Sequence, residues 1–192
     1  MSTSDISKLR AETGAGMLDC KKAIDEAGGD FDKAIELLRK RGIAKAAKRA
    51  GKVAAEGIVA SYIHAGGKIG VLVEVNSETD FVAKNEEFIQ LARDIAMQIV
   101  ATAPRFTQRE EVTEEDTKAA EEVFRKEVED KPVEMQSKII QGKIDSFLKE
   151  KILLEQDYIK DQSLTIKSLI ESATQKFGEN IVVSNFSRYS IK

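Results

Sequence analysis

The hydrophobic pattern of the first fifty residues predicts three short helices. Apolar residues recur every three or four positions in three successive stretches, which is the period of an amphipathic helix. The pair Gly28-Gly29 ends the second stretch, and Asp30 suits the N-cap of the third. Gly42 is expected to end that third helix. We therefore expect a compact three-helix module with a small core.

From Gly57 the period of the pattern changes to two. The stretches GIVASYIHA (57–65) and KIGVLVEVN (68–76) flank Gly66-Gly67, which is typical of a β-hairpin. In the second arm one face is expected to carry Ile69, Val71, Val73 and Val75. The closing stretch ENIVVSNFSRYSIK predicts a further strand, which can pair with the hairpin.

Helical periodicity returns after the hairpin. Asn85 suits the cap of a helix that ends before Pro104, and further helices are predicted from about Thr113, after Pro132 and from about Lys167. The fold class is therefore α+β, in which a small antiparallel sheet, the hairpin plus the C-terminal strand, packs with helices. The predicted domains are a module with a basic linker (1–53) and a core (54–192), with a helical excursion at about 105–150.

Composition and charge exclude several classes of function. With 30 basic and 33 acidic residues, the net charge of -3 gives no overall attraction to nucleic acid or to an anionic membrane. No apolar run approaches the ~20 residues that span a bilayer. The single cysteine, Cys20, excludes an intrachain disulfide framework and fits a reducing compartment, so a cytoplasmic location is expected.

Residues for enzymatic chemistry are sparse. His64 is the only histidine and is predicted at the surface near the hairpin tip, whereas Cys20 has the helical spacing of a core residue. The sequence has no match to the glycine-rich loops that bind phosphates. We expect no catalytic residue, no cofactor and no metal site, so the sequence predicts a binding protein.

The stretch from Arg39 to Ala55 has no acidic residue and is rich in Ala, Lys and Arg. It is consistent with a solvated helical linker, or with a contact for an acidic partner or RNA through residues 40–52. The net charge and the lack of interleaved aromatic residues argue against RNA.

Two large apolar residues, Phe81 and Val82, stand in the polar connection EVNSETDFVAKNEEF (74–88). They either tuck under the following helix as a hydrophobic staple or, in the case of Phe81, project as an anchor for a partner. Asp80 either caps the turn or contacts the same partner. The pattern leaves both interpretations open.

The motif TDFVAKN (79–85) resembles a signature of elongation factor Ts, the guanine-nucleotide exchange factor for elongation factor Tu. The stretch LRAETGAGMLDCKKAIDEAGGDFDKAIELLRKRG (9–42) is similar to the ubiquitin-associated-like N-terminal module of that family. The stretches LLEQDYIKDQSLTI and FGENIVVSNFSRYSI resemble its later core segments, so the resemblance covers nearly the whole chain.

This resemblance implies a mechanism and its residues. Phe81 would enter an apolar pocket of the partner's G domain, Asp80 would contact the same region, and Thr79 and Val82 would support them. The partner's magnesium and phosphate site would be disturbed and GDP would leave. The N-terminal module would dock elsewhere on the G domain through Leu9 and the turn formed by Thr13, Gly14, Ala15, Gly16 and Met17.

The length resembles the short, Thermus-like bacterial form, which implies a homodimer through the core. Some short members have a cysteine in the last strand, where this chain has Ser187, so a covalent dimer there is excluded. The expected partners are elongation factor Tu and a second copy of the chain, with no membrane and no direct nucleic acid. The alternative function is a helical protein-binding adaptor without exchange activity.

Overall fold

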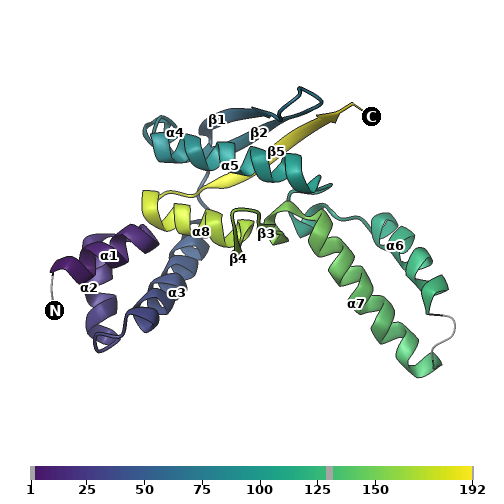
Figure 1. Ribbon diagram of the computed structural model, residues 1–192, viewed down its shortest axis with the longest axis horizontal. Coiled ribbons are helices and arrows are strands. Elements are labelled where there is room, and N and C mark those ends of the chain that lie inside the picture. The colour runs from purple at the N-terminus through teal and green to yellow at the C-terminus, as the bar shows by residue number, and fades with distance from the viewer. Residues whose placement is uncertain (1–2, 129–131, 192) are drawn as a thin grey trace. The chain divides into compact units, whose positions relative to one another are not determined.

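The computed structural model describes residues 3–128 and 132–191 of the chain. Figure 1 shows the elements, which mix helices and strands and confirm the α+β class. In chain order they are α1 (Thr3–Thr13), α2 (Met17–Glu26), α3 (Phe31–Arg49), β1 (Glu56–Ile63), β2 (Ile69–Ser77), α4 (Asp80–Ala83), α5 (Glu86–Thr102), η1 (Arg109–Glu111), α6 (Glu114–Glu127), α7 (Val133–Lys151), η2 (Leu153–Glu155), β3 (Asp157–Tyr158), β4 (Asp161–Thr165), α8 (Ile166–Phe177) and β5 (Val182–Ser190).

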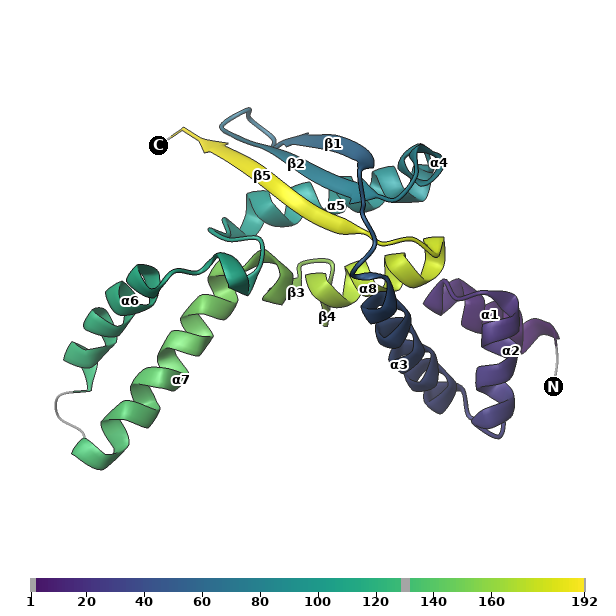
Figure 2. The same cartoon turned by 180° about the vertical axis from the view of Figure 1, so that it is seen from behind.

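The main sheet consists of the predicted hairpin and the C-terminal strand, in the order β1-β2-β5, and it is antiparallel. Figure 2 shows the three strands side by side. The expected alternation along β2 is confirmed, because Val71, Val73 and Val75 are buried whereas Leu72 is exposed. The hairpin turns at Gly66 and Gly67, whose positive φ angles of 87° and 69° favour glycine.

The three predicted N-terminal helices are present as α1, α2 and α3. Asp30 caps α3 as expected, because its side chain accepts a hydrogen bond from the backbone N–H of Lys33 at 3.1 Å. The core of the three helices contains Leu9, Ala15, Cys20, Ala23, Ile24, Ala34 and Leu38. Except for Ala15, which lies in the turn between α1 and α2, these residues lie in the predicted helices.

The predicted end of the third helix at Gly42 is wrong. Helix α3 continues through Gly42 to Arg49, so it runs without a break into the basic stretch that was expected to be a separate helical linker. Gly42 is buried, and a Cβ added there would overlap the carboxamide of Gln175 on α8. The glycine therefore lets α8 approach the helix closely instead of ending it, a contact that the sequence pattern does not reveal.

The chain forms two compact units, each assembled from separated segments. The first unit runs up to Ala60 and adds Glu74–Arg93 and Lys167–Ser184. The second unit comprises Ser61–Val73, Asp94–Ile166 and the chain from Asn185. The domain boundary after residue 53 stays a prediction.

The second unit contains the predicted helical excursion. Helices α6 and α7 pack against each other around Ala120, Ile144 and Leu148. Thr113 caps α6 in a capping box. The Thr113 hydroxyl accepts from the backbone N–H of Asp116, and the Asp116 carboxylate accepts from the backbone N–H of Thr113. Residues 129–131, between the two helices, lie outside the described residues.

A buried amide joins α5 to the β3–β4 segment in the second unit. The Nε2 of Gln98 donates to the Oε1 of Gln156 at 3.1 Å. The Oε1 of Gln98 accepts from the backbone N–H of Ile159 at 2.9 Å. Nearby, the Tyr158 hydroxyl donates to Asp94 at 2.8 Å. Burial and the neighbouring carboxylate raise the pKa of Tyr158 well above its usual range.

Within residues 3–128 and 132–191, no helix is long and apolar enough to cross a membrane.

Candidate partner-binding site

The structure separates Phe81 from Val82. Both lie in α4, a single helical turn that follows β2 directly. Phe81 is 82% exposed, whereas Val82 and Ala83 are 5% exposed. Of the two interpretations left open by the sequence, the structure therefore shows the projecting one for Phe81 and the packed one for Val82. Large apolar side chains rimmed by charge are typical of partner-binding sites.

Thr79, and not Asp80, caps this turn. The Oγ1 of Thr79 accepts from the N–H of Val82 at 3.5 Å. Asp80 instead pairs with Lys84 one turn later, at 2.6 Å between Oδ2 and Nζ. This hydrogen bond with Lys84 lowers the pKa of Asp80 and raises the pKa of Lys84. This exposed ion pair joins the first residue of α4 to the residue that follows it, on either side of Phe81 in the sequence.

The base of the turn is held by Glu179, which lies about a hundred residues away in the chain. Its Oε2 accepts hydrogen bonds from the backbone N–H of Glu78 at 3.1 Å and of Thr79 at 3.0 Å. Its Oε1 accepts from the hydroxyl of Thr79 at 2.6 Å. One carboxylate thus binds both the backbone N–H and the hydroxyl of Thr79, the N-cap of α4.

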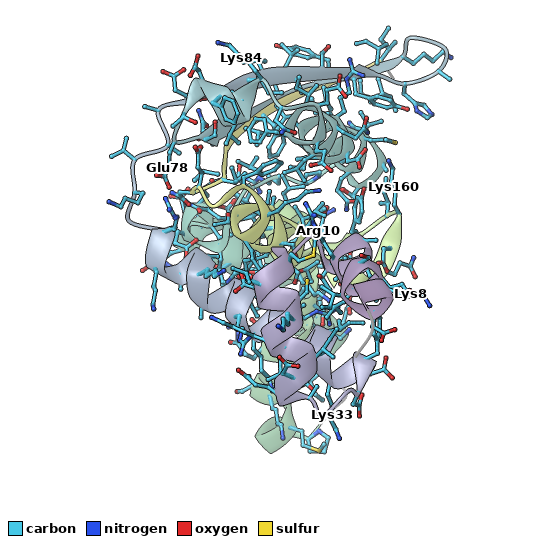
Figure 3. All side chains as sticks on the ribbon, turned by 90° about the vertical axis from the view of Figure 1, so that its left-hand side faces the viewer. Lys8, Arg10, Lys33, Glu78, Lys84 and Lys160 are labelled. Carbon is cyan, nitrogen blue, oxygen red and sulfur yellow. The ribbon has the colours of Figure 1, made fainter. Side chains whose placement is uncertain are left out.

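Glu78 makes the reciprocal contact to the segment that carries Glu179. Its carboxylate accepts from the N–H of Asn180 at 2.7 Å and forms a salt bridge with Arg49 of α3 at 2.9 Å. Figure 3 labels Glu78 and also Lys84, the residue that directly follows α4. The hydrogen bonds from Asn180 and from Arg49 lower the pKa of Glu78.

Sequence reasoning missed Glu78, Glu179 and Arg49. Each is a charged residue in a polar stretch, and no local pattern distinguishes them from other surface charges. Asn180 adds a further tie, because its Nδ2 donates to the carbonyl of Lys52 at 2.8 Å. These contacts join segments that are far apart in the sequence, and therefore only the folded chain reveals them.

The residues predicted for docking have different environments. Leu9 is fully buried in the core of the three helices and Ala15 is 1% exposed, so neither side chain is on the surface. The side chain of Thr13 bonds within its own helix, because its hydroxyl donates to the carbonyl of Leu9 at 2.6 Å. Met17 is 47% exposed, and its neighbour Leu18 is 75% exposed. Met17 and Leu18 therefore form the accessible apolar part of this segment.

The turn between α1 and α2 borders a depression of about 650 Å³ in the first unit. Its other side is lined by Asn85, the last residue of the TDFVAKN motif, and by Glu87 and Lys176, which form a salt bridge at 2.7 Å. Arg10, labelled in Figure 3, also lines it. The depression therefore lies between the predicted docking turn and the end of the TDFVAKN motif, while the predicted exchange residues Thr79 to Val82 do not line it.

Four basic side chains of the stretch from Arg39 to Ala55 form salt bridges within the protein. Arg41 pairs with Glu26, Lys45 pairs with Asp19, and Arg49 pairs with Glu78. Lys40 pairs with Glu36 on the same helix. Pairing leaves these cations less available to an RNA backbone, so the helical interpretation is the better supported one.

Cys20 and His64 lie where the sequence predicted. Cys20 is buried, its Sγ lies 3.6 Å from the carbonyl of Ala15, and burial raises the pKa of its thiol. His64 is exposed at the hairpin tip. Among the described residues there is no group of three or more His, Cys, Asp and Glu side chains that could hold a metal ion.

Comparisons with known proteins place the chain in a family. Residues 32–192 match the family model described as Elongation factor TS. The chain is 52% identical to elongation factor Ts of Desulforamulus reducens and 52% identical to that of Moorella thermoacetica. These alignments span 100% of this chain and 89% and 95% of the respective relatives. It is 50% identical to elongation factor Ts of Fervidobacterium nodosum over 100% of this chain and 98% of that protein. The chain therefore belongs to the elongation factor Ts family of translation elongation factors.

Proposed function

We propose that the protein is a guanine-nucleotide exchange factor that binds elongation factor Tu with GDP and promotes release of the GDP. The observation that supports this most directly is the 82% exposure of Phe81 on a turn held by hydrogen bonds from a distant segment. A turn whose backbone is already ordered loses little conformational entropy on binding. Phe81 would enter an apolar pocket of the partner's G domain, and Asp80 would contact the rim.

The exchange step cannot depend on Phe81 alone. Accelerating GDP release by three to five powers of ten requires a preference of about 4–7 kcal/mol for the nucleotide-free partner. Burial of one phenylalanine side chain contributes only about 1.5–3 kcal/mol. Other contacts that differ between the two partner states must therefore contribute, and Asp80 with its neighbour Lys84 is the nearest charged pair that can do so.

The N-terminal helices would recruit the partner. Contacts that are equally strong in both partner states raise affinity but do not shift the nucleotide equilibrium. Met17 and Leu18 supply the exposed apolar surface, and Thr13, Gly14, Ala15 and Gly16 shape the turn that presents it. Leu9 would act through the packing of the helices, because its side chain is buried.

A second copy of the chain would cover the outer face of the sheet. In the second unit Ile63, Leu72, Tyr189 and Ile191 are 65%, 49%, 72% and 71% exposed. An apolar group of this kind on a sheet whose other face is buried favours burial by a partner. Ser187 is exposed on the same strand as Tyr189, so such a homodimer would be held by packing rather than by a disulfide.

In this proposal the protein performs no covalent chemistry and acts in the cytoplasm. The nucleotide and the magnesium ion belong to elongation factor Tu, and the factor itself needs no cofactor, membrane or direct nucleic-acid contact. The adaptor alternative shares the docking step but predicts no change in the rate of nucleotide release.

A stopped-flow experiment tests the proposal. Purified elongation factor Tu is loaded with a fluorescent GDP, and release is followed after mixing with excess GDP and increasing factor. We expect release to accelerate to a plateau, and the plateau to fall about tenfold or more with Phe81→Ala. Binding without acceleration would instead support the adaptor, and an unchanged Phe81→Ala plateau would contradict the role of Phe81.

A further inference from the structure

We propose that Glu179 is a positioning residue for exchange, which orders the turn that presents Phe81. The inference rests on the proposed function and assigns a role that neither residue type nor sequence position indicates. The carboxylate accepts from both backbone N–H groups that precede α4, at 3.1 and 3.0 Å. These two groups belong to Glu78 and Thr79, directly before the first residues of the turn.

The same carboxylate also orients the cap of α4. The hydroxyl of Thr79 donates to Oε1 of Glu179 at 2.6 Å. Because that proton is committed to Glu179, the hydroxyl oxygen presents a lone pair to the N–H of Val82. A chain of hydrogen bonds therefore runs from Glu179 through Thr79 to Val82, the residue after Phe81.

A turn of four residues needs such support. Helix α4 comprises only Asp80–Ala83, and a helix this short is not stable by itself. The Ser77 hydroxyl adds a further hydrogen bond by donating to the Thr79 carbonyl at 2.9 Å. Val82, which is 5% exposed, packs into the protein interior. Phe81 has no comparable tie through its own side chain, since 82% of it is exposed. Its direction is therefore set by the backbone that Glu179 holds.

Glu179 also connects this turn to the N-terminal helices through its neighbour. Asn180 donates its backbone N–H to Glu78 and its side-chain amide to the carbonyl of Lys52. Arg49 of α3 completes the contact by pairing with Glu78. The segment 179–180 thus contacts both the turn with Phe81 and the end of the segment proposed for recruitment. Loss of Glu179 should loosen the turn while leaving these Glu78 contacts in place.

The prediction concerns which kinetic parameter changes. If a loosened turn presents Phe81 correctly for a smaller fraction of the time, the plateau rate of GDP release falls by that fraction. The factor concentration at half-maximal rate depends mainly on the recruiting helices and should change by less than about twofold. For Glu179→Ala we expect the plateau to fall about three- to tenfold, in line with the loss of the hydrogen bonds.

Three further variants make the assignment specific. Glu179→Gln should keep at least about half of the plateau, because its carboxamide oxygen can accept both N–H groups while its amino group faces a reoriented Thr79 hydroxyl. Glu179→Asp keeps the charge but retracts the oxygens, so its plateau should fall as in Glu179→Ala. Glu171→Ala removes a carboxylate from α8 that makes none of these contacts, and it should leave both parameters unchanged.

A double variant separates positioning from general stability. In a Phe81→Ala background, adding Glu179→Ala should change the plateau by less than about 1.5-fold, because the residue acts through Phe81. Thermal unfolding by circular dichroism identifies a variant that fails to fold, in which case Glu179→Asp replaces Glu179→Ala in the comparison. An equal reduction in both backgrounds would overturn the positioning role, as would Asp behaving like the parent while Gln does not.

The outcomes distinguish this inference from the proposed function. If Phe81→Ala leaves release unchanged, the proposed role of Phe81 fails and the role of Glu179 fails with it. If Phe81→Ala slows release but Glu179→Ala and Glu179→Asp do not, only the positioning role is overturned.

Discussion

Phe81 and Val82 are adjacent in the sequence and opposite in environment, with exposed fractions of 82% and 5%. The single turn of α4 separates them, because neighbouring residues on a helix point about 100° apart. One apolar residue therefore secures the turn, and the other is presented to a partner.

Alanine substitutions at these two positions should affect different properties, GDP release for Phe81 and stability for Val82. Phe81→Ala removes no internal packing, so the free energy of unfolding should change by less than about 0.5 kcal/mol while GDP release slows. Val82→Ala creates a cavity and should cost about 2 kcal/mol. Urea unfolding of both variants, beside the stopped-flow assay, checks the contrast. A large loss of stability in Phe81→Ala would contradict the exposed placement of the ring.

The outer face of the sheet is predicted to join two copies of the chain. Leu72→Lys puts a charge in the middle of the exposed apolar group and should convert a homodimer to a monomer. Light scattering coupled to size exclusion measures the mass directly. Val123→Lys, the same kind of change at an exposed position of α6, should keep the parent mass. A parent protein that is monomeric at tens of micromolar would rule out a stable dimer.

The Glu78 contacts should make stability depend on pH. The hydrogen bonds from Asn180 and Arg49 lower the pKa of Glu78 in the folded state below its usual value of 4.5. Its contribution is therefore complete above the unfolded pKa and is lost as the pH falls through the lower, folded pKa. Glu78→Gln should be less stable than the parent at pH 7, and the difference should shrink below about pH 4.5. Urea titrations at several pH values measure it, and a difference that grows in acid would refute the assignment.

Gly57 should tolerate no side chain. Its φ of 147° is rarely adopted by other residues, and an added Cβ would lie 2.7 Å from the Cα of Asn76. Because that atom belongs to the neighbouring strand, Gly57→Ala should cost about 2 kcal/mol in the free energy of unfolding. Gly51→Ala, at a position with open space around it, is the matched control and should have little effect.

The buried amide of Gln98 should contribute to the stability of the second unit. Gln98→Leu keeps most of the volume but leaves the N–H of Ile159 without its acceptor. Because this hydrogen bond is only partly buried, we expect a cost of about 1 kcal/mol, at the lower end for an unsatisfied donor. Thermal unfolding should show the loss, whereas nucleotide release at 20 °C should stay near the parent rate. A variant as stable as the parent would show that water or a relaxed backbone satisfies Ile159.

Local sequence patterns predicted the longer helices and the three strands of the main sheet, but not α4 or the β3–β4 pair. Apolar periodicity predicted the three N-terminal helices, the hairpin with its buried Val71, Val73 and Val75, and the later helices. These features depend on local spacing and capping, as with Asp30 and Thr113, so each is encoded within a few residues. Phe81 became the candidate anchor because the TDFVAKN motif resembles that of a known family. Periodicity alone did not show whether its side chain is buried or exposed.

Long-range contacts, which local patterns do not reveal, hold the turn of Phe81 and account for the glycine inside the third helix. Glu179 reaches Thr79 across a hundred residues of chain, and Gln175 occupies the space that a side chain at position 42 would fill. Both contacts depend on where α8 and the segment after it lie against the rest of the first unit. Local propensity carries no information about such long-range contacts, because they form only when packing of the core fixes the distant segments together.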